Sequence, residues 1–314
     1  MTKQRNKTKK PKKWLWITSS ILGVIILAIA AYVYSIYHSV QTAADKMYEA
    51  PTREVSKKRE EKVEFVKKDP ISILILGVDE RSNDKGRSDT MIVMTVNPED
   101  KSMKMVSIPR DTRTEIVGRG TQDKINHAYA FGGTDMSVET VENFLDIPID
   151  YYVKVNMESF KDIVDSVGGV NVNNPFAFSD GGFTFNKGEI SLNGEQALAY
   201  SRMRKKDPRG DFGRQDRQKQ IIMGVIQKGA SFSSLGKHDD IFEVLGSNVK
   251  TNLTFDQMVD IQANYKEARH NLEQLQVKGG GDTINKIYYY IVPEAERLAL
   301  SQEFKEHLEL VQGN

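Results

Sequence analysis

The hydrophobic pattern begins with one long apolar run and continues with many short ones. The long run, Trp14 to Tyr37, contains no charged residue. As a helix that rises ~1.5 Å per residue, it is long enough to cross the ~30 Å hydrocarbon core of a bilayer. Tryptophan and tyrosine side chains stand near its two ends, where an interfacial aromatic belt belongs. Residues 14–37 are therefore predicted to form a transmembrane anchor.

A cleaved signal peptide is the competing interpretation, because Ala28-Ile29-Ala30 resembles a cleavage site. The apolar run exceeds the usual ~7–15 residues of a signal peptide, which favours an uncleaved anchor. Residues 1–13 are basic with no acidic residue among them, so they are expected to stay in the cytoplasm. The prediction is a single-pass type II membrane protein with everything after Tyr37 outside the cell.

The pattern changes twice after the apolar run. Residues 38–69 are charged and poorly periodic, which is typical of a solvated stalk. In residues 70–314, apolar runs of strand length mix with segments of helical period. We expect a single α/β domain with a central mixed β-sheet flanked by helices, because neither an internal repeat nor a second linker is visible. The expected strands are Ile71–Val78, Met91–Val96, Lys104–Ile108, Tyr152–Val155, Leu275–Val277 and Lys286–Val292, with a hairpin around residues 180–182. The expected helices are Ile125–Phe131, Met136–Leu145, Phe160–Val167, Gly194–Tyr200, Phe212–Lys228, Ile241–Val249, Phe255–Ala268 and Pro293–Val311.

Composition adds one constraint on the chemistry. The 314 residues carry a net charge of +1 and no cysteine, which fits an exported domain without disulfides. No ATP pool exists outside the cytoplasm, so an exported domain that handles phosphate needs a substrate that is already activated.

Charged clusters stand where three of the predicted strands begin or end. Asp79 follows the first strand, Asp89 precedes the second, and Arg110 and Asp111 follow the third. Ligands of open α/β sheets gather beyond the carboxyl ends of strands. Two carboxylates that flank one loop can share a magnesium ion, which takes one or two carboxylates plus phosphate oxygens and water. The alternatives are a turn cap at Asp79 and ion pairs of Asp89 with Arg87 and of Arg110 with Asp111.

The stretch from Tyr200 to Gln220 is strongly basic. Asp207-Pro-Arg-Gly210 is typical of a turn, and Asp211 stands where the N-cap of the next helix is expected. On that helix Arg217 lies ~100° away from its neighbour Gln218 and is expected to point elsewhere.

Four side chains of this stretch can converge on one anionic ligand. Arg202 and Arg204 precede the turn, and Arg214 and Gln218 fall one above the other on one helix face. Arginine suits a bidentate grip on phosphate oxygens. A solvated basic loop and a nucleic-acid-binding patch are the alternatives.

Other catalytic motifs are missing from the sequence. It has no zinc-type cluster of Cys and His, no G-x-S-x-G, no phosphate-binding P-loop and no dinucleotide-binding G-x-G-x-x-G. His127 beside Asn126 is more typical of a hydrogen-bonded structural residue than of a catalytic one. The apolar helix faces normally form core, yet in a membrane-tethered domain they can also leave a slot for a lipid tail.

Five motifs in this order resemble those of the LytR–CpsA–Psr family of Gram-positive bacteria. They are G-V-D-E-R, R-S-D-T, S-I-P-R-D-T, K-I-N-H-A-Y-A-F-G-G, and Y-S-R-M-R-K-K-D-P-R-G-D-F-G-R-Q-D-R-Q. The similarity covers the anchor and essentially the whole exported domain.

The resemblance implies a phosphotransferase that acts in cell wall biogenesis. Such an enzyme moves a teichoic acid or a similar anionic glycopolymer from a polyprenyl-pyrophosphate carrier to the C6 hydroxyl of N-acetylmuramic acid in peptidoglycan. The implied cofactor is Mg²⁺ or another divalent cation, and the prenyl chain is expected in an apolar tunnel between sheet and helices. The implied partners are the lipid-linked polymer, peptidoglycan and the cytoplasmic membrane, with no nucleic acid and with the catalytic domain extracellular.

The resemblance also implies a role for each matching residue. Asp79 and Asp89 are the metal-associated carboxylates, and the implied catalytic residues are Asp79, Arg110, Asp111 and Arg204, with Asp111 orienting Arg110. The implied pyrophosphate ligands are Arg87, Arg110, Arg202, Arg204, Arg214 and Gln218.

Three other functions use parts of the same pattern. A phosphatase or pyrophosphatase that acts on the lipid pyrophosphate needs the same residues and differs only in the acceptor. A membrane-anchored regulator that binds nucleic acid is disfavoured, because the basic stretch is expected on the far side of the membrane from DNA and no helix-turn-helix is evident. A passive wall-binding module does not need carboxylates paired with arginines.

Overall fold

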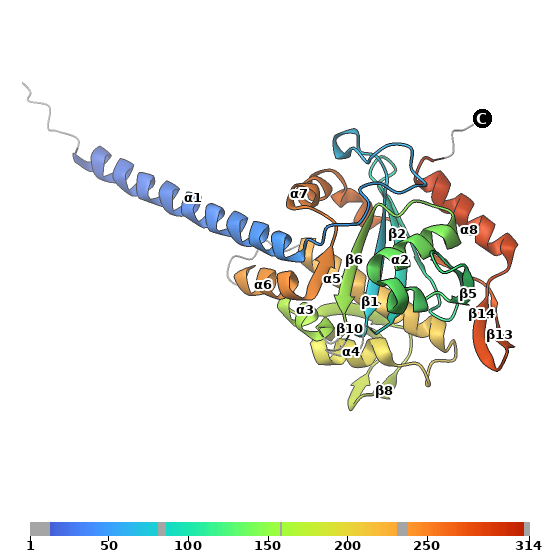
Figure 1. The fold of residues 1–314 in the computed structure, drawn as a ribbon. Coiled ribbons are helices and arrows are strands. Elements are labelled where there is room, and N and C mark those ends of the chain that lie inside the picture. Colours follow the sequence, from blue (N-terminus) through green and yellow to red (C-terminus); the bar gives the residue numbers. More distant parts are fainter. Residues whose placement is uncertain (1–12, 81–85, 158, 231–237, 311–314) are drawn as a thin grey trace, which may run out of the picture.

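The computed structural model describes residues 13–80, 86–157, 159–230 and 238–310. A six-stranded mixed sheet forms the centre of the domain, as expected, and helices cover its two faces (Figure 1). Most of the predicted cytoplasmic segment 1–13 and the last residues of the chain lie outside the described residues.

The order of the strands brings several strand ends to one edge. The sheet runs β11-β6-β1-β2-β3-β12, with β1 parallel to β6, β3 parallel to β12, and the other neighbours antiparallel. The carboxyl ends of β1, β3, β6 and β12 and the start of β2 therefore share one edge. The strands are β1 Ile71–Val78, β2 Ser88–Asn97, β3 Ser102–Ser107, β6 Tyr151–Asn156, β11 Val249–Thr251 and β12 Leu272–Gln276.

Each face of the sheet is buried against its own group of helices. On one face, Leu74, Leu76 and Val93 pack with α2 and α8. On the other, Ile73 and Ile92 pack with α5, α7 and the short helices η1 and η2. This explains why β1 reads as a continuous apolar run and not as an alternating one. The helices are α2 His127–Leu145, α3 Phe160–Ser166, α4 Gly194–Arg202, α5 Asp211–Ala230, α6 His238–Asn248, α7 Phe255–Asn264, α8 Glu294–His307, η1 Phe65–Lys67 and η2 Lys266–His270.

Four hairpins surround the central sheet. The hairpin expected around residues 180–182 is present as β8 and β9, whereas β4, β5, β7, β10, β11 and β13 were not predicted. The two helices expected before and after residue 133 form one element, α2, that is kinked at Gly133 (φ 68°, ψ −149°). The hairpin strands are β4 Arg113–Ile116, β5 Thr121–Lys124, β7 Val170–Asn174, β10 Gly188–Leu192, β8 Phe178–Asp180, β9 Phe183–Phe185, β13 Gly280–Ile284 and β14 Ile287–Ile291.

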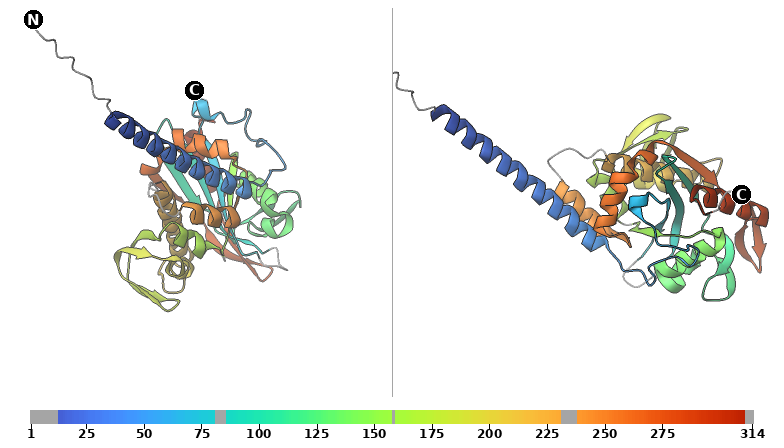
Figure 2. Two further views of the ribbon diagram at one scale, coloured as in Figure 1. Left: turned by 90° about the vertical axis from the view of Figure 1, so that its left-hand side faces the viewer. Right: turned by 90° about the horizontal axis from the view of Figure 1, so that it is seen from above.

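Helix α1 (Lys13–Met47) projects away from the domain (Figures 1 and 2). Within the described residues it is the one helix long and apolar enough to cross a membrane, which suggests a membrane anchor. It continues past the apolar run, and its last turns pack on the domain. Ala43 and Ala44 are buried there, Ala43 lies against Gly246 of α6, and the rings of Tyr37 and Phe255 meet edge to face at 5.2 Å.

The segment after α1 differs from the solvated stalk that the sequence predicted. Arg59 forms a bidentate ion pair with Asp150 at 2.7 and 2.8 Å, with only 10% and 6% of the two side chains exposed. Ser56 donates a hydrogen bond to the buried Glu142, and Phe65 packs in the core. These three residues attach the segment to the domain, although most of the charged side chains between residues 48 and 69 are exposed.

Candidate functional site

The start of β2 and the exit of β3 form the first part of the site. Asp89 and Arg110 face each other across these antiparallel neighbours, with Arg110 Nη1 3.0 Å from Asp89 Oδ2. Both side chains are partly exposed. The predicted convergence at one sheet edge is therefore observed, although Asp89 pairs with Arg110 and not with Arg87.

Asp111 is held mainly by a residue that the sequence analysis did not single out. Its carboxylate accepts a hydrogen bond from Lys124 Nζ at 2.6 Å, whereas Arg110 Nε lies 3.9 Å away. Lys124 ends β5 and opens the K-I-N-H motif, so the motif itself was the available signal. Asn126 from the same motif lies beside Asp89, at 3.5 Å from its amide nitrogen to Asp89 Oδ1.

The first turn of α5 contributes the second part of the site. The helix begins at Asp211 itself, whose Oδ1 lies 2.8 Å from Arg214 Nη2 and 3.7 Å from Arg204 Nε. Arg214 is the least exposed arginine of this group, with 13% of its side chain exposed, while 55% of the Arg204 side chain is exposed.

The pKa of Arg214 depends on charged residues from both parts of the site. Burial lowers the pKa of its guanidinium and the cations Arg110 and Arg204 lower it further, whereas Asp211 and Asp89 oppose the shift. Its Nε is buried and has no hydrogen-bond partner among the described residues. A buried, charged donor without a partner costs free energy, and an anionic ligand would satisfy it.

Asp79 follows β1 on the same edge as Asp89, and its backbone N–H donates to the carbonyl of Arg87 at 3.2 Å. Gly86 (φ 68°) makes this turn possible, since a Cβ atom there would lie 2.0 Å from the Asp79 carbonyl oxygen.

The contacts at the sheet edge and at the first turn of α5 bring Asp89, Arg110, Arg204 and Arg214 into one cluster, which we call the arginine cluster.

Two of the predicted ligands stay outside the ion pairs of the arginine cluster. The side chains of Arg87 and Arg202 are exposed. Arg202 ends α4, and Arg87 precedes β2, so both stand at the rim of the site.

Arg217 has a structural role, in agreement with its predicted separation from the Gln218 face. Only 1% of its side chain is exposed, and it forms an ion pair with the fully buried Asp207 and a hydrogen bond to the Tyr200 carbonyl at 3.1 Å. A Cβ on Gly213 would lie 1.7 Å from Asp207 Oδ2, so glycine is required where this carboxylate meets the helix. The buried pair fixes the turn that carries Arg204.

Arg209, in the same turn, is half exposed and pairs with Asp216 at 2.6 Å.

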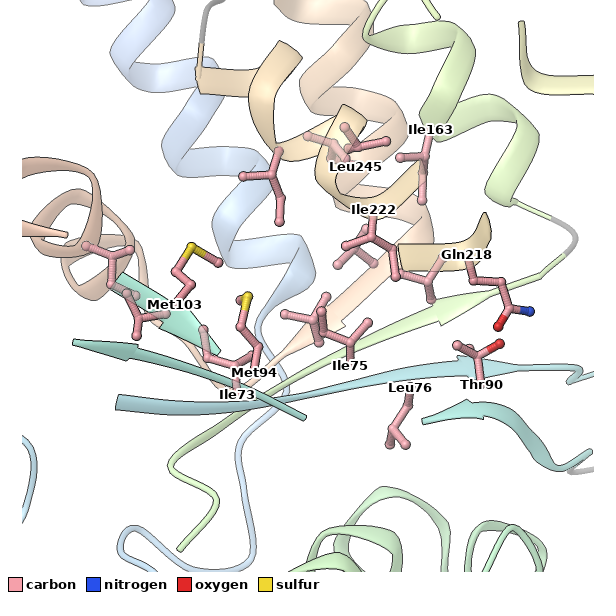
Figure 3. A pocket seen from close by; sticks show the side chains of 18 of the residues that line it. Ile73, Ile75, Leu76, Thr90, Met94, Met103, Ile163, Gln218, Ile222 and Leu245 are labelled. Atoms are coloured by element: carbon pink, nitrogen blue, oxygen red, sulfur yellow. The ribbon is translucent and has the colours of Figure 1, made fainter. Parts of the chain in front are cut away.

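An apolar cavity of about 490 Å³ lies between the sheet and α5. Its polar lining residues include Gln218, Ser201 and Thr90, together with Gln262, Lys266 and Arg269. Figure 3 shows Gln218 and Thr90 close together at one end. Met94 and Met103 lie toward the other end. Because Gln218 is one helical turn after Arg214, one end of the cavity lies beside the arginine cluster.

His127 has the environment expected of a structural histidine. Its Nδ1 lies 2.8 Å from Asp123 Oδ2, and its ring contacts Phe131 edge to face. No group of three or more His, Cys, Asp or Glu side chains suited to a metal occurs among the described residues.

Comparison with known proteins gives consistent results. The sequence is 56% identical, over 97% of this chain and 99% of the relative, to the polyisoprenyl-teichoic acid–peptidoglycan teichoic acid transferase TagU of Bacillus subtilis. The crystal structure of B. subtilis TagU superposes with a TM-score of 0.66 at 57% identity and covers 79% of this chain and all of that one. A structure of TagT bound to LI-WTA has a TM-score of 0.71 at 32% identity, over 83% of this chain and 99% of that one. The profile of the LytR_cpsA_psr family matches residues 33–306. The chain therefore belongs to the LytR_cpsA_psr family.

Proposed function

We propose that this protein transfers teichoic acid, or a similar anionic glycopolymer, from a polyprenyl-pyrophosphate carrier to peptidoglycan. The observation that carries the proposal is one junction on α5. Arg214 presents an unpartnered buried donor in the arginine cluster, and Gln218, one turn later, lines a long apolar cavity. A ligand that fills both needs a doubly anionic head and a long apolar tail, which describes a polyprenyl pyrophosphate.

The cavity supports binding of the polyprenyl tail. Its walls come mainly from β1, β2, β6 and α5, with contributions from α1, α3, α6 and α7. They consist largely of aliphatic and methionine side chains, among them Ile73, Ile75, Met94 and Ile222. Such walls bind a tail through the hydrophobic effect, at roughly 25 cal/mol for each Å² of apolar surface removed from water. They discriminate little between prenyl chains of similar width.

The arginine cluster supports binding of the two phosphates. Arg110, Arg204 and Arg214 supply planar guanidinium groups whose paired donors match phosphate oxygens. Phosphoryl transfer depends mainly on positioning and charge stabilisation, and these groups provide both. In the reaction, the acceptor hydroxyl oxygen bonds to the phosphorus of the polymer and the bond from that phosphorus to the bridging oxygen breaks. Polyprenyl phosphate leaves with the electron pair, and the hydroxyl proton passes to a carboxylate of the site or to water.

The donor set at the sheet edge fits a magnesium ion. Magnesium binds one or two carboxylates and completes its shell with phosphate oxygens and water, so Asp79 and Asp89 are sufficient. Asn126 adds a buried amide oxygen that has no hydrogen-bond partner among the described residues. We propose that Asp79 and Asp89 hold the ion, which would neutralise charge on the pyrophosphate.

The proposed topology is a type II anchor with an extracellular catalytic domain. Residues 1–13 are basic and precede the apolar part of α1, which favours a cytoplasmic N-terminus. The activated pyrophosphate bond makes a nucleotide unnecessary on the outer side.

The experiment is a transfer assay with the full-length protein in detergent. It would be incubated with lipid-linked polymer, peptidoglycan oligomers and Mg²⁺, and the products identified by mass spectrometry. We expect a phosphodiester between polymer and peptidoglycan. Release of free polymer phosphate with peptidoglycan left unmodified would instead show a hydrolase.

A further inference from the structure

A second cavity lies on the face of the sheet that α5 covers, on the other flank of that helix. It has a volume of about 450 Å³. Its walls come from the ends of β3 and β12 and the first turns of α5, and the residues that matter here are Ser107, Phe212, Gln215, Lys219, Gln274 and Gln276. We call this cavity the flanking pocket.

Strand register explains why the polar side chains point into the flanking pocket. Ser107 is opposite Ile92 in the antiparallel pair and opposite Gln276 in the parallel pair. Ile92 packs against the α5 side of the sheet, and residues paired across strands project to the same face. Ser107 and Gln276, and Gln274 two residues before, therefore project toward α5.

The flanking pocket contains a hydroxyl group without a partner. Only 6% of Ser107 is exposed, and its Oγ has no hydrogen-bond partner among the described residues. Buried hydroxyl groups are normally hydrogen-bonded, so this one requires an explanation. A ligand in the pocket could supply the missing bond.

The chemistry of the walls favours a neutral, polyhydroxylated ligand. Three glutamine amides both donate and accept hydrogen bonds, and the ring of Phe212 adds an apolar surface. The cations that line the pocket share a carboxylate: Lys219 and Arg209 lie 2.9 and 2.6 Å from Asp216. With these charges partly compensated, the flanking pocket differs from the arginine cluster and suits an N-acetylated sugar better than a phosphate.

One carboxylate joins the flanking pocket to the arginine cluster. Asp211 Oδ2 accepts a hydrogen bond from Gln215 Nε2 at 3.2 Å, while Asp211 Oδ1 lies 2.8 Å from Arg214. Gln215 lines the flanking pocket, so a sugar bound there would lie beside the phosphate-binding residues.

The order of the strands gives the direction of attack. The apolar cavity lies mainly over β6, β1 and β2, the flanking pocket lies over β3 and β12, and the arginine cluster stands between them. In phosphoryl transfer the attacking and leaving oxygens are roughly in line through phosphorus. With polyprenyl phosphate leaving toward the apolar cavity, the acceptor hydroxyl arrives from the side of the flanking pocket.

We propose that the flanking pocket binds the N-acetylated sugar of peptidoglycan that carries the attacking hydroxyl. This proposal rests on the proposed transferase function. The lipid-linked polymer also contains sugars, so the test has to separate the two sources.

The test compares Ser107→Ala and Gln276→Leu with the wild type in full-length protein. Transfer would be measured while peptidoglycan oligomer is varied at fixed lipid-linked polymer, and then the reverse. Loss of one neutral hydrogen bond should raise KM for peptidoglycan roughly 2- to 10-fold. KM for the lipid-linked polymer and the melting temperature should stay unchanged, or the melting temperature should rise in Ser107→Ala, because an unpartnered buried hydroxyl is removed. Gln302→Leu, on the exposed face of α8, is the matched control and should change neither KM.

A direct binding measurement separates this proposal from the transferase function. Saturation-transfer NMR would use an N-acetylglucosamine–N-acetylmuramic acid disaccharide with wild type, Ser107→Ala and Gln276→Leu. Binding that Gln276→Leu weakens supports the pocket even in a preparation without transfer activity. Unchanged disaccharide binding in both pocket variants, or a rise in KM for the lipid-linked polymer alone, would overturn the assignment to the acceptor.

Discussion

Arg217 and Asp207 form an ion pair in the interior, between the helix that carries Arg214 and the turn that carries Arg204. With 1% and 0% of their side chains exposed, neither group can exchange its partner for water. The position of the exposed arginines depends on a buried one. In this basic stretch, charges that hold the fold and charges available to a ligand lie within a few residues of each other.

Replacing Arg217 should therefore unfold the protein more readily and not merely inactivate it. Arg217→Met leaves Asp207 buried without its partner, which typically costs about 3–5 kcal/mol of unfolding free energy. Urea unfolding followed by circular dichroism measures the change. Arg209→Met is the control for stability, because Arg209 is half exposed and its loss should cost less than about 1 kcal/mol.

The pH dependence of the same pair has a definite sign. Burial tends to raise the pKa of Asp207, but hydrogen bonds from Arg217 and from the Arg209 N–H outweigh it and hold the pKa below 3.8. The pair therefore stabilises the wild type above this pH and its contribution is lost as the pH falls further. In Arg217→Met the unpaired carboxyl prefers its neutral form. The loss of unfolding free energy relative to the wild type should therefore become smaller as the pH falls from 7 to 4. A deficit that is constant over this range would contradict the buried-pair interpretation.

Gly86 should be needed for the geometry of the proposed metal site. Gly86→Ala combines a left-handed backbone conformation with a clash against the Asp79 carbonyl, so transfer and stability should both fall, with about 1 kcal/mol or more lost in unfolding. Gly120→Ala isolates the conformational part, because Gly120 also has positive φ (62°) but no atom within 4 Å of its Cβ position. Equal losses of transfer in the two variants would argue against a special role for the β1–β2 turn.

Metal ligands and arginines should be separable by mutation. Asp79→Ala should abolish transfer with little recovery in excess Mg²⁺, while lipid binding survives in part. Arg204→Lys keeps the charge but loses the guanidinium fork, so transfer should fall roughly 10- to 150-fold, the value of one charge-assisted hydrogen bond. Lys205→Ala, an exposed neighbour in the same basic stretch, should be near wild type. The test measures the transfer rate and the lipid affinity of the three variants, each checked for folding by circular dichroism. A severe defect in Lys205→Ala together with normal transfer by Asp79→Ala would show that the site is misassigned.

The apolar cavity should bind the prenyl chain. Ile222→Trp fills part of it, so the purified protein should retain less polyprenyl phosphate, and transfer from long-chain donors should suffer more than transfer from a short-chain analogue. Ile222→Leu preserves the volume and serves as the control. Lipid extracted from each variant and quantified by mass spectrometry gives the answer, and equal lipid content would place the chain elsewhere.

The proposed topology makes a simple prediction. An alkaline phosphatase fused after Asn314 should be active only when exported. Activity of a reporter that works solely in the cytoplasm at the same position would reverse the orientation.

Local sequence patterns were sufficient where one run of residues sets the structure. Residues 71–78 read as a strand buried on both faces, and they form β1 with those bounds. The charges at the ends of neighbouring strands converge because β1 and β3 run in the same direction, and their motifs also identified the family. By contrast, β11 has only three residues and forms by pairing with β6, a partner that local periodicity does not reveal.

Long-range pairing also explains the other differences. Residues 48–69 carry the composition of a stalk, yet Arg59 finds Asp150 far along the chain and binds the segment to the domain. Lys124 was missed as the partner of Asp111 for the same reason. The family resemblance implied an apolar tunnel between sheet and helices, but the residues that line it and the flanking pocket could not be named from sequence, since they depend on how α5 crosses the sheet.

The length of α1 past its apolar run has a mechanical consequence. The helix continues from Tyr37 to Met47, and Met47 forms part of the wall of the apolar cavity. Ten further residues of helix correspond to a rod of about 15 Å. Because Tyr37, at the end of the apolar run, already contacts Phe255 of α7 and the last turns pack on α6, the domain lies alongside this rod. In the proposed topology, the rod holds the domain close to the bilayer surface at a fixed tilt. A long prenyl chain could then enter the cavity with one end still in the membrane, so that the substrate never has to leave the bilayer completely.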